Sequence, residues 1–201
     1  MSGNYDRKDK LYQRAKEEGY RSRAAFKLIE LDKKYKLLRS GIKVVDLGCW
    51  PGGWLQVVAG RLGTQGVAVG IDLVETIPFS EPNVHVVTGD AREDVNIEKV
   101  RSYAPEGFDL LLSDMSPKLS GIKEADQAGT VACAELALWG AQTLLKKGGS
   151  FVCKVFKGNE TELFYRAARP AFEKLQRSEL DATRKTSNEF YLIGTGYKGQ
   201  S

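Results

Sequence analysis

Four aspartates, each at or near the end of an apolar run, give the first indication of chemistry in this sequence. They are Asp46 within residues 43–47, and Asp72, Asp90 and Asp114, which end the runs 66–72, 84–90 and 108–114. Ligands of open α/β sheets bind outside the carboxyl ends of the strands, where these acids are expected to converge. One such aspartate commonly caps a turn. Four in succession predict a ligand crevice at one edge of a sheet.

The segment "VVDLGCWPGGW" (44–54) places a glycine-rich turn directly after the first of these runs. Gly48, Gly52 and Gly53 allow the backbone to approach a ligand closely. Asp72 is positioned to accept hydrogen bonds from ribose hydroxyls, which predicts a cofactor that contains a nucleoside. The glycine spacing differs from the dinucleotide pattern and the turn lacks the lysine of a Walker loop, so a pyrophosphate is not favoured.

The acids also indicate the charge of that cofactor. Asp90 and Asp114 add negative charge around it, which suits a cation better than a dinucleotide. The sulfonium of S-adenosylmethionine (SAM) meets this requirement. An NAD-dependent dehydrogenase is the alternative, because Asp72 equally suits the ribose of NAD. The Tyr-x-x-x-Lys pattern of that class, Tyr12 to Lys16, lies before the first strand, where a short-chain dehydrogenase would not have it.

Apolar runs alternate with helical patterns along the chain. Strands are expected at 43–47, 66–72, 84–90, 108–114 and 150–156. Helices are expected at 22–38, 54–62, 94–103, 126–146 and 160–175. The near-continuous Val, Ile and Leu of the strands favour an α/β fold with a mostly parallel sheet, covered by helices on both faces. The segment 180–197 reads as two strands joined by a polar turn, which predicts an antiparallel hairpin at the edge of the sheet.

Length and composition are typical of one folded domain spanning 1–201. The 201 residues are 42% hydrophobic and 28% charged. No apolar run reaches the roughly 18 residues that span a membrane, and the amino terminus lacks the apolar stretch of a secretion signal, so we expect a cytoplasmic protein without a membrane partner. The three cysteines are widely spaced and His85 is the only histidine. We therefore expect neither a disulfide framework nor a metal site.

Positive charge is concentrated at the amino-terminal end. Residues 1–40 contain 12 Lys or Arg against 6 Asp or Glu, a net charge of +6, which leaves −2 for the remainder of a chain whose net charge is +4. This basic, helical segment is either a solvated face or a surface for a polyanionic partner.

Five motifs in order resemble those of one known family. They are "AKEEGYRSRAAFKLIELDKKYKLL" (15–38), "DLGCWPGGW" (46–54), "SDMSPKLSG" (113–121), "CKVFKG" (153–158) and "RKTSNEFYLIGTGYKG" (184–199). Together they cover nearly the whole chain and resemble the FtsJ/RrmJ ribose 2′-O-methyltransferases. The resemblance implies a Rossmann-like, SAM-dependent methyltransferase fold with a mostly parallel seven-stranded sheet and an antiparallel C-terminal hairpin.

The resemblance also implies a Lys-Asp-Lys-Glu tetrad at the reaction centre. It places the tetrad on Lys27, Asp114, Lys154 and Glu189, and each position holds the expected residue type. Lys154 is then the general base that takes the proton of the ribose hydroxyl. Burial and the neighbouring Lys27 favour its neutral amine, whereas the two carboxylates favour the charged form. The alternative is that the carboxylates orient a lysine that mainly positions the substrate.

The same resemblance implies a set of cofactor contacts, with Asp72 on the ribose and Asp90 near the adenine. Together with Gly48 and Gly53 of the turn, the contacts are Gly52, Trp54, Asp72, Asp90 and Asp114. The chain departs from the family before "PGGW", where Cys49 and Trp50 replace small residues. Trp50 is able to stack on the cofactor or on a base, or to pack against a helix, and packing is the expectation.

RNA is the expected partner, because the target hydroxyl exists on RNA and not on DNA. Basic residues interleaved with tyrosines predict phosphate contacts and base stacking. The candidate RNA contacts are Arg7, Lys8, Lys10, Arg14, Arg21, Arg23, Lys118, Lys157 and Arg184. The chain most resembles enzymes that methylate a uridine of large-subunit ribosomal RNA, with the ribosomal subunit as the expected context. A tRNA methyltransferase is the alternative within the family. A nonenzymatic ribosome-assembly factor is disfavoured by the intact tetrad.

Overall fold

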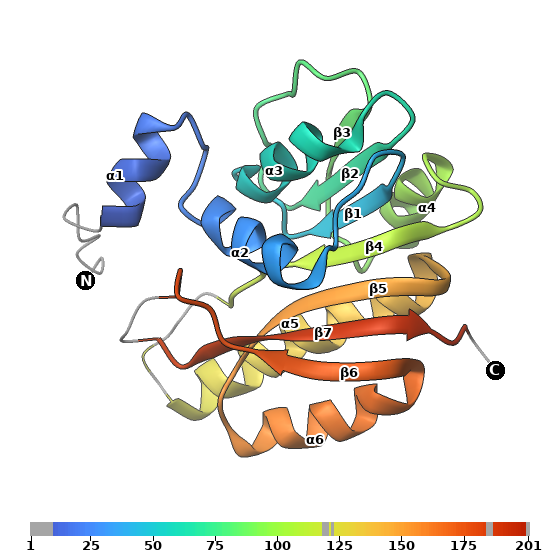
Figure 1. The fold of residues 1–201 in the computed structure, drawn as a ribbon. Helices are drawn as coiled ribbons and strands as arrows, with labels where there is room; N and C mark the ends of the chain where they lie inside the picture. Colours follow the sequence, from blue (N-terminus) through green and yellow to red (C-terminus); the bar gives the residue numbers. More distant parts are fainter. Residues whose placement is uncertain (1–9, 118–120, 122, 184–186, 200–201) are drawn as a thin grey trace.

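One seven-stranded sheet forms the centre of the computed structural model, which describes residues 10–117, 121, 123–183 and 187–199 (Figure 1). The strands are β1 (Lys43–Leu47), β2 (Val67–Asp72), β3 (Val84–Thr88), β4 (Phe108–Ser113), β5 (Leu145–Phe156), β6 (Phe172–Ser178) and β7 (Glu189–Tyr197). Their spatial order is β3-β2-β1-β4-β5-β7-β6. The first five strands are parallel, and β7 lies antiparallel between β5 and β6. The expected α/β class, a mostly parallel sheet with an antiparallel C-terminal pair, is confirmed.

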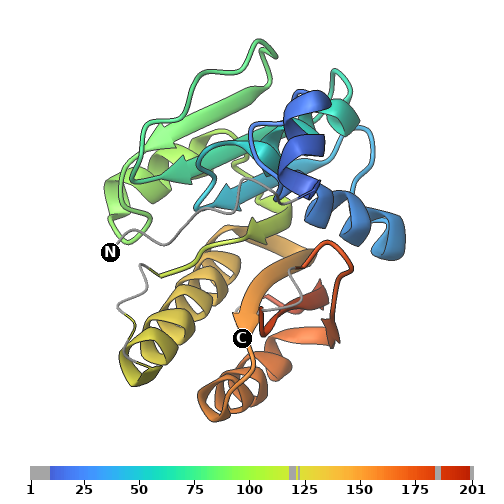
Figure 2. The ribbon, with the colours of Figure 1, turned by 90° about the vertical axis from the view of Figure 1, so that its left-hand side faces the viewer.

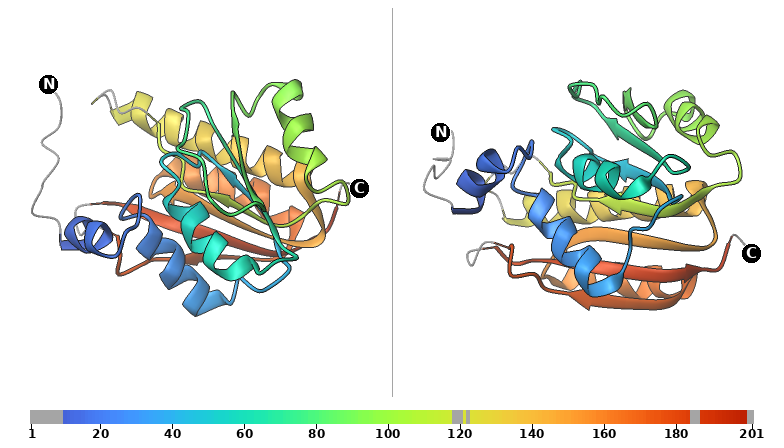
Figure 3. Two further views of the ribbon diagram at one scale, coloured as in Figure 1. Left: turned by 90° about the horizontal axis from the view of Figure 1, so that it is seen from above. Right: turned by 45° about the horizontal axis from the view of Figure 1, so that its top comes forward.

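Helices cover both faces of the sheet. They are α1 (Lys10–Glu17), α2 (Ala25–Tyr35), α3 (Gly53–Leu62), α4 (Asp94–Ser102), α5 (Lys123–Leu144), α6 (Asn159–Ala168) and a 3₁₀ turn at Arg169–Ala171. The helices α2 and α3 lie on one face, and α4, α5 and α6 lie on the other (Figure 3). None of the helices in the described ranges is long and apolar enough to cross a bilayer.

The central strands are apolar because both of their faces are covered. In β1, Val44 packs in the core beneath α2 and α3, whereas Val45 packs in the core beneath α5. The paired residues of β4 repeat this alternation, with Leu110 on the first side and Leu111 on the second. Successive side chains of a strand point to opposite faces, so a doubly covered strand favours apolar residues on both faces.

The C-terminal third differs from the expected elements. The helix expected at 160–175 ends at Ala168, and the next seven residues after the 3₁₀ turn form β6. Phe172 and Leu175 are spaced three apart, which imitates a helical face in the sequence, although both are buried from a strand. Pro170 lacks the N–H that would continue the helix. The hairpin expected within 180–197 is therefore wrong in its first strand, because β7 pairs with β6 instead.

The amino-terminal helices stand at the carboxyl ends of the parallel strands. Figure 1 shows α1 beyond the ends toward which β1, β2 and β4 point, and Figure 2 views the molecule from that side. A small apolar cluster of Ala15, Phe26 and Ala182 joins α1 to α2 and to the loop before β7. The basic segment thus borders the edge of the sheet where ligands are expected.

Candidate active site

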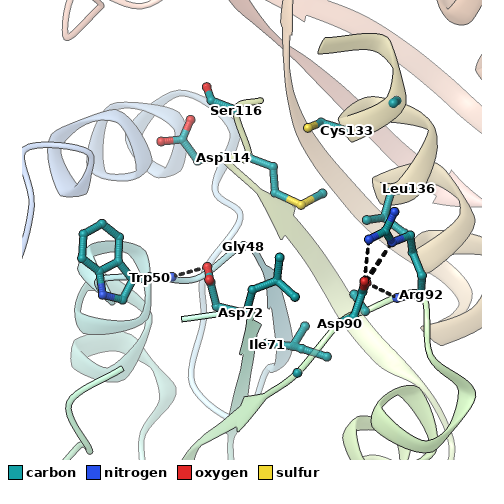
Figure 4. A pocket seen from close by; sticks show the side chains of 15 residues that line it. Gly48, Trp50, Ile71, Asp72, Asp90, Arg92, Asp114, Ser116, Cys133 and Leu136 are labelled. Atoms are coloured by element: carbon teal, nitrogen blue, oxygen red, sulfur yellow. Dashed lines mark hydrogen bonds and ion pairs between the residues drawn. The ribbon is translucent and has the colours of Figure 1, made fainter. Parts of the chain in front are cut away.

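The carboxyl ends of the parallel strands border a cavity of about 650 Å³ (Figure 4). Gly48 after β1, Asp72 at the end of β2, Asp90 after β3 and Asp114 after β4 all contribute to its wall. Its volume lies within the range of small-molecule sites in proteins. Three of the four strand-end acids, Asp72, Asp90 and Asp114, therefore converge on one cavity, as their positions in the sequence predict.

The turn after β1 forms the floor of this cavity, and it requires glycine at Gly48. That residue has a φ of +73°, and a Cβ added to it would lie 2.3 Å from Cγ of Met115. Any larger residue would require Met115, which also lines the cavity, to move. The predicted reason for this glycine, close approach of the backbone to a ligand, therefore agrees with the local geometry.

The other three predicted cofactor contacts lie beside the large cavity rather than in its wall. Gly53 and Trp54 border a smaller cavity of about 40 Å³. The Trp54 indole is buried and donates a hydrogen bond to the carbonyl of Ala24 at 2.8 Å. Gly52 has a φ of +104° and begins α3. The side chain of Trp54 therefore joins α3 to the residue before α2 and is almost fully buried.

Asp72 fixes the two segments that flank the cavity mouth. Its Oδ2 accepts the backbone N–H of Trp50 at 2.9 Å, and its Oδ1 accepts the backbone N–H of Val74 at 2.9 Å. A carboxylate oxygen has a second lone pair, so both oxygens retain an acceptor site toward the cavity. Asp72 is thereby held ready to receive hydroxyl donors, as expected of a ribose contact.

Asp90 is held by Arg92. The guanidinium donates to both carboxylate oxygens, with Nη2 to Oδ2 at 2.5 Å and Nε to Oδ1 at 3.0 Å, and the backbone N–H of Arg92 donates to Oδ1 at 2.9 Å (Figure 4). These hydrogen bonds lower the pKa of Asp90. The carboxylate is therefore ionised and oriented at the end of the cavity opposite Asp114, which fits an acceptor for an exocyclic amine.

Asp46 is a site residue that the sequence did not single out from the other strand-end acids. It is 1% exposed and borders the small cavity together with Gly53 and Asp114. Its Oδ2 is the one buried side-chain oxygen or nitrogen of the described residues that lacks a hydrogen-bond partner. Burial, followed by the charges of Asp114 and Asp72, holds the pKa of Asp46 well above its usual range.

This unpaired carboxyl supplies a test of whether SAM fits the site. An orphaned buried acceptor is costly unless a ligand satisfies it. The amino acid end of SAM carries an ammonium group, the donor that Asp46 lacks, and its nucleoside end matches the acceptors Asp72 and Asp90. The residues present therefore fit SAM: Asp46 would accept a hydrogen bond from its ammonium group, and Asp72 and Asp90 would accept from its nucleoside.

We predict that Asp46→Asn stabilises the cofactor-free protein and weakens SAM binding. Because the folded-state pKa is raised, the contribution of Asp46 to stability is present at low pH and is lost as pH rises from about 4 through the raised pKa. The variant removes this loss, so its melting temperature exceeds that of the wild type at neutral pH. SAM affinity falls about 10- to 100-fold, since a hydrogen bond to a charged group is removed. Thermal melts across pH and calorimetric titration check both effects; an unchanged affinity would contradict the assignment.

The four tetrad residues come from four distant elements and meet beside the large cavity. Lys27 lies on α2, Asp114 follows β4, Lys154 lies within β5 and Glu189 begins β7. Lys27 Nζ is 2.5 Å from Glu189 Oε1 and 3.8 Å from Asp114 Oδ1. Lys154 Nζ is 3.1 Å from Asp114 Oδ1 and donates a hydrogen bond to the Asp114 carbonyl at 2.5 Å. The sequence predicts this gathering only through the family resemblance.

The tetrad is a buried, electrically balanced cluster. The lysine side chains are 8% and 6% exposed for Lys27 and Lys154, and the carboxylates are 18% and 10% exposed for Asp114 and Glu189. Two cations and two anions give no net charge, which limits the cost of burying them. Asp114 is the shared member, because it contacts both lysines and also borders the large cavity.

Tyr191 is a fifth member of the cluster that sequence reasoning missed. It is fully buried, it lies opposite Lys154 in the β5–β7 register, and its hydroxyl donates to Asp114 Oδ1 at 2.6 Å. Burial, followed by the charge of Asp114, raises the pKa of Tyr191, so the hydroxyl stays protonated and remains a donor. Tyr191 comes two residues after Glu189 and so lies on the same face of the strand. This spacing could have predicted its place in the cluster.

We predict that Tyr191→Phe lowers kcat about tenfold, because Asp114 loses the donor that fixes its orientation toward Lys154. The KM values for both substrates stay within about twofold, since Tyr191 lies behind the carboxylate. Steady-state kinetics check this split, with Tyr197→Phe as the control, because Tyr197 lies at the other end of β7 and its hydroxyl donates to the carbonyl of Gln142 on α5. An unchanged kcat in Tyr191→Phe would contradict the positioning role.

The structure describes five of the nine predicted RNA contacts, and four of these five form hydrogen bonds or ion pairs within the protein. Arg7, Lys8, Lys118 and Arg184 lie outside the described residues. Lys10 is exposed at the start of α1, and Arg14 pairs with Glu18 at 2.6 Å. Arg23 donates a hydrogen bond to the carbonyl of Ala182, and Lys157 pairs with Glu179 at 2.6 Å.

Arg21 is anchored in the fold. Its guanidinium donates to the carbonyls of Ile77 at 2.6 Å and Pro78 at 2.9 Å and lies over the ring of Phe79. It joins the α1–α2 linker to the loop after β2. This arrangement favours a structural role for Arg21 over the expected phosphate contact, because its donors face carbonyl oxygens.

Trp50 differs from its expectation. It is 55% exposed and borders both the large and the small cavity, so the expected packing against a helix is wrong. Figure 4 shows its indole at one side of the cavity mouth, next to Asp72.

The seven-stranded fold, the nucleoside-sized cavity at the strand ends and the buried lysine–carboxylate cluster beside it define a Rossmann-like methyltransferase. The family model described as FtsJ-like methyltransferase matches residues 20–197. The chain therefore belongs to the FtsJ-like methyltransferase family. The family, enzyme class and cofactor expected from the sequence are confirmed, since SAM is the methyl donor of this class.

Relatives with curated names extend over almost the same length. The chain is 40% identical to "Ribosomal RNA large subunit methyltransferase E" of Pseudomonas fluorescens, covering 96% of this chain and 92% of that protein. It is 43% identical to the protein of the same name from Dechloromonas aromatica, covering 92% and 90%. A crystal structure assigned as a ribosomal RNA methyltransferase of Plasmodium falciparum superposes with a TM-score of 0.79 at 28% identity, covering 90% of this chain and all of that one.

Proposed function

We propose that the protein transfers a methyl group from SAM to the 2′-hydroxyl of a ribose in RNA, and that its target is a uridine of large-subunit ribosomal RNA. The observation that carries this proposal is the convergence of Lys27, Asp114, Lys154 and Glu189 beside the cofactor cavity. The names of the relatives support ribosomal RNA as the substrate class.

The four tetrad residues contribute to the reaction in two ways, by positioning the reactants and by proton transfer. When bound, SAM supplies a methyl group activated by a positively charged sulfur. After its ammonium has released one proton to solvent, the neutral Nζ of Lys154 accepts the proton of the ribose hydroxyl, while Asp114 holds that amine by its carboxylate and its backbone carbonyl. Lys27 and Glu189 neutralise each other as an ion pair beside this centre.

Typical magnitudes indicate whether positioning or proton transfer contributes more to lowering the activation barrier. Holding two reactants in attack geometry contributes about 7–11 kcal/mol to lowering a barrier. A positioned general base contributes about 10²–10⁴-fold, which equals about 3–5 kcal/mol. The rigid cluster on three strands and a helix therefore matters more as a positioning device than as a source of basicity.

The amino-terminal segment supplies the expected RNA surface. Lys10 is exposed on α1, and Arg14 lies on the same helix beyond the strand ends. We predict that RNA affinity falls steeply with salt and that Lys10→Glu flattens the slope of log K against log salt by about 0.7, the value for one phosphate contact on a single strand. Lys147→Glu, which changes an exposed lysine at the far end of β5, leaves the slope unchanged. A wild-type affinity independent of salt would contradict a phosphate-binding surface.

The decisive experiment is to incubate the purified protein and SAM with large-subunit RNA, free and in isolated subunits, from cells that lack the gene. The expected product is one new 2′-O-methyluridine, located by mass spectrometry and primer extension. Methylation of tRNA instead would replace the substrate assignment. A modified base, with every ribose unmodified, would overturn the proposed chemistry.

A further inference from the structure

Four large apolar side chains are exposed on the turn after β1 and the loop after β2, and two of them border the large cavity. Trp50 is 55% exposed, and Leu73, Val74 and Ile77, in the loop after β2, are 68%, 50% and 76% exposed. They are four of the seven large hydrophobic residues that are exposed in the described part of the chain. We propose that Trp50, with the loop beside it, is a stacking surface for a nucleobase of the RNA substrate. This inference rests on the proposed function.

The surface is rigid rather than mobile. The backbone N–H groups of Trp50 and Val74 are both held by the carboxylate of Asp72. The thiol of Cys49, the residue before Trp50, lies 4.0 Å from the hydroxyl of Thr76 and joins the same two segments. An aromatic ring that is fixed before binding loses little conformational freedom when a base stacks on it.

The loop after β2 also contacts the basic amino-terminal segment. Arg21, in the α1–α2 linker, donates to the carbonyl of Ile77 and stacks on Phe79. Trp50 borders the small cavity together with Ser22 of the same linker. The apolar surface therefore lies between the cofactor cavity and the segment expected to contact RNA phosphates, where a base next to the reacting ribose is expected.

The cofactor alone does not account for this surface. Trp50 and Leu73 border the large cavity, but Val74 and Ile77 do not. A molecule confined to the cavity would leave the outer two side chains in water, so a ligand that covers all four must extend beyond the cavity. Exposed apolar groups of this kind commonly mark binding sites.

Stacking on an aromatic side chain is a sequence-tolerant contact. It contributes about 1–3 kcal/mol per base, and it needs a base that is not paired in a duplex. Trp50 therefore adds affinity for RNA with an unpaired nucleotide near the target and does not read the identity of the target base.

The test compares Trp50→Ala with Trp50→Phe in the methyl transfer assay. We expect KM for RNA to rise about 5- to 100-fold in Trp50→Ala, which corresponds to the loss of one stacked base. KM for SAM stays within about twofold, and Trp50→Phe recovers most of the RNA affinity because it keeps an aromatic face. Trp139→Ala is the matched control, because this partly exposed indole lies on α5. Addition of an unpaired oligonucleotide quenches wild-type tryptophan fluorescence and has a much smaller effect in Trp50→Phe.

Three outcomes would overturn the inference. A rise in KM for SAM with unchanged KM for RNA assigns the indole to the cofactor. Unchanged values for both substrates in Trp50→Ala show that nothing stacks there. A wild-type protein that binds SAM but methylates no RNA overturns the proposed function together with this inference, whereas the first two outcomes leave the proposed function standing.

Discussion

Replacing Lys154 by methionine is expected to lower kcat by about 10²–10⁴-fold, the contribution of a positioned general base. Methionine keeps the length and the apolar stem of the lysine within β5 and removes only the amine that contacts Asp114. SAM affinity stays within about threefold, because Lys154 does not border the cofactor cavity. Single-turnover methyl transfer and calorimetric titration of SAM measure the two quantities separately.

The control for this variant is Lys147→Met. Lys147 lies on the same strand but is exposed at its other end, away from the cavity. Its activity is expected to equal that of the wild type. Lys154→Arg adds a further test, since arginine keeps the positive charge but does not lose its proton in proteins. If Lys154→Arg retained full activity, Lys154 would be a positioning residue and water or another group would take the proton.

The sequence identifies the strands of this fold more reliably than its last helix. Strands β1 to β4 begin and end within two residues of their expected bounds, because uninterrupted apolar runs are required where helices cover both faces. Strand β6 was missed because it lies at the edge, where only Phe172, Leu175 and Ser178 are buried. That spacing is compatible with a helix. Pairing with β7, a contact between distant segments, decides its conformation.

Some residues of the candidate site could be predicted from the sequence, and others could not. The positions of Asp72, Asp90 and Asp114 at the ligand site could be predicted from the strand ends alone. The contact between Lys27 and Glu189 could be predicted only from the family resemblance. The sequence could not show that Asp46 is the acid left without a partner, because the other strand-end acids look the same before they fold. Which acid finds a hydrogen-bond partner depends on the tertiary structure. The exposure of the Trp50 indole in the glycine-rich turn depends on it as well.

The buried pair of Lys27 and Glu189 allows stability to be separated from catalysis. In the wild type, two lysines and two carboxylates cancel in charge. Lys27→Met leaves a net charge of −1 in a buried cluster, and Glu189→Gln leaves +1. We expect each single variant to lose about 3–5 kcal/mol of unfolding free energy, the cost of leaving a buried charge unpaired. The double variant is neutral again and is expected to recover most of this loss.

Activity is expected to follow a different pattern. All three variants remain at least about 10²-fold below the wild type in kcat, because neither the amine of Lys27 nor the carboxylate of Glu189 returns in the double variant. Urea denaturation measures stability, and single-turnover methyl transfer measures catalysis. The exposed pair of Arg177 and Glu162 serves as the control cycle, with a coupling of about 0–1 kcal/mol. Recovery of activity together with stability in the double variant would mean that the pair is structural, and the reaction centre would then reduce to Lys154 and Asp114.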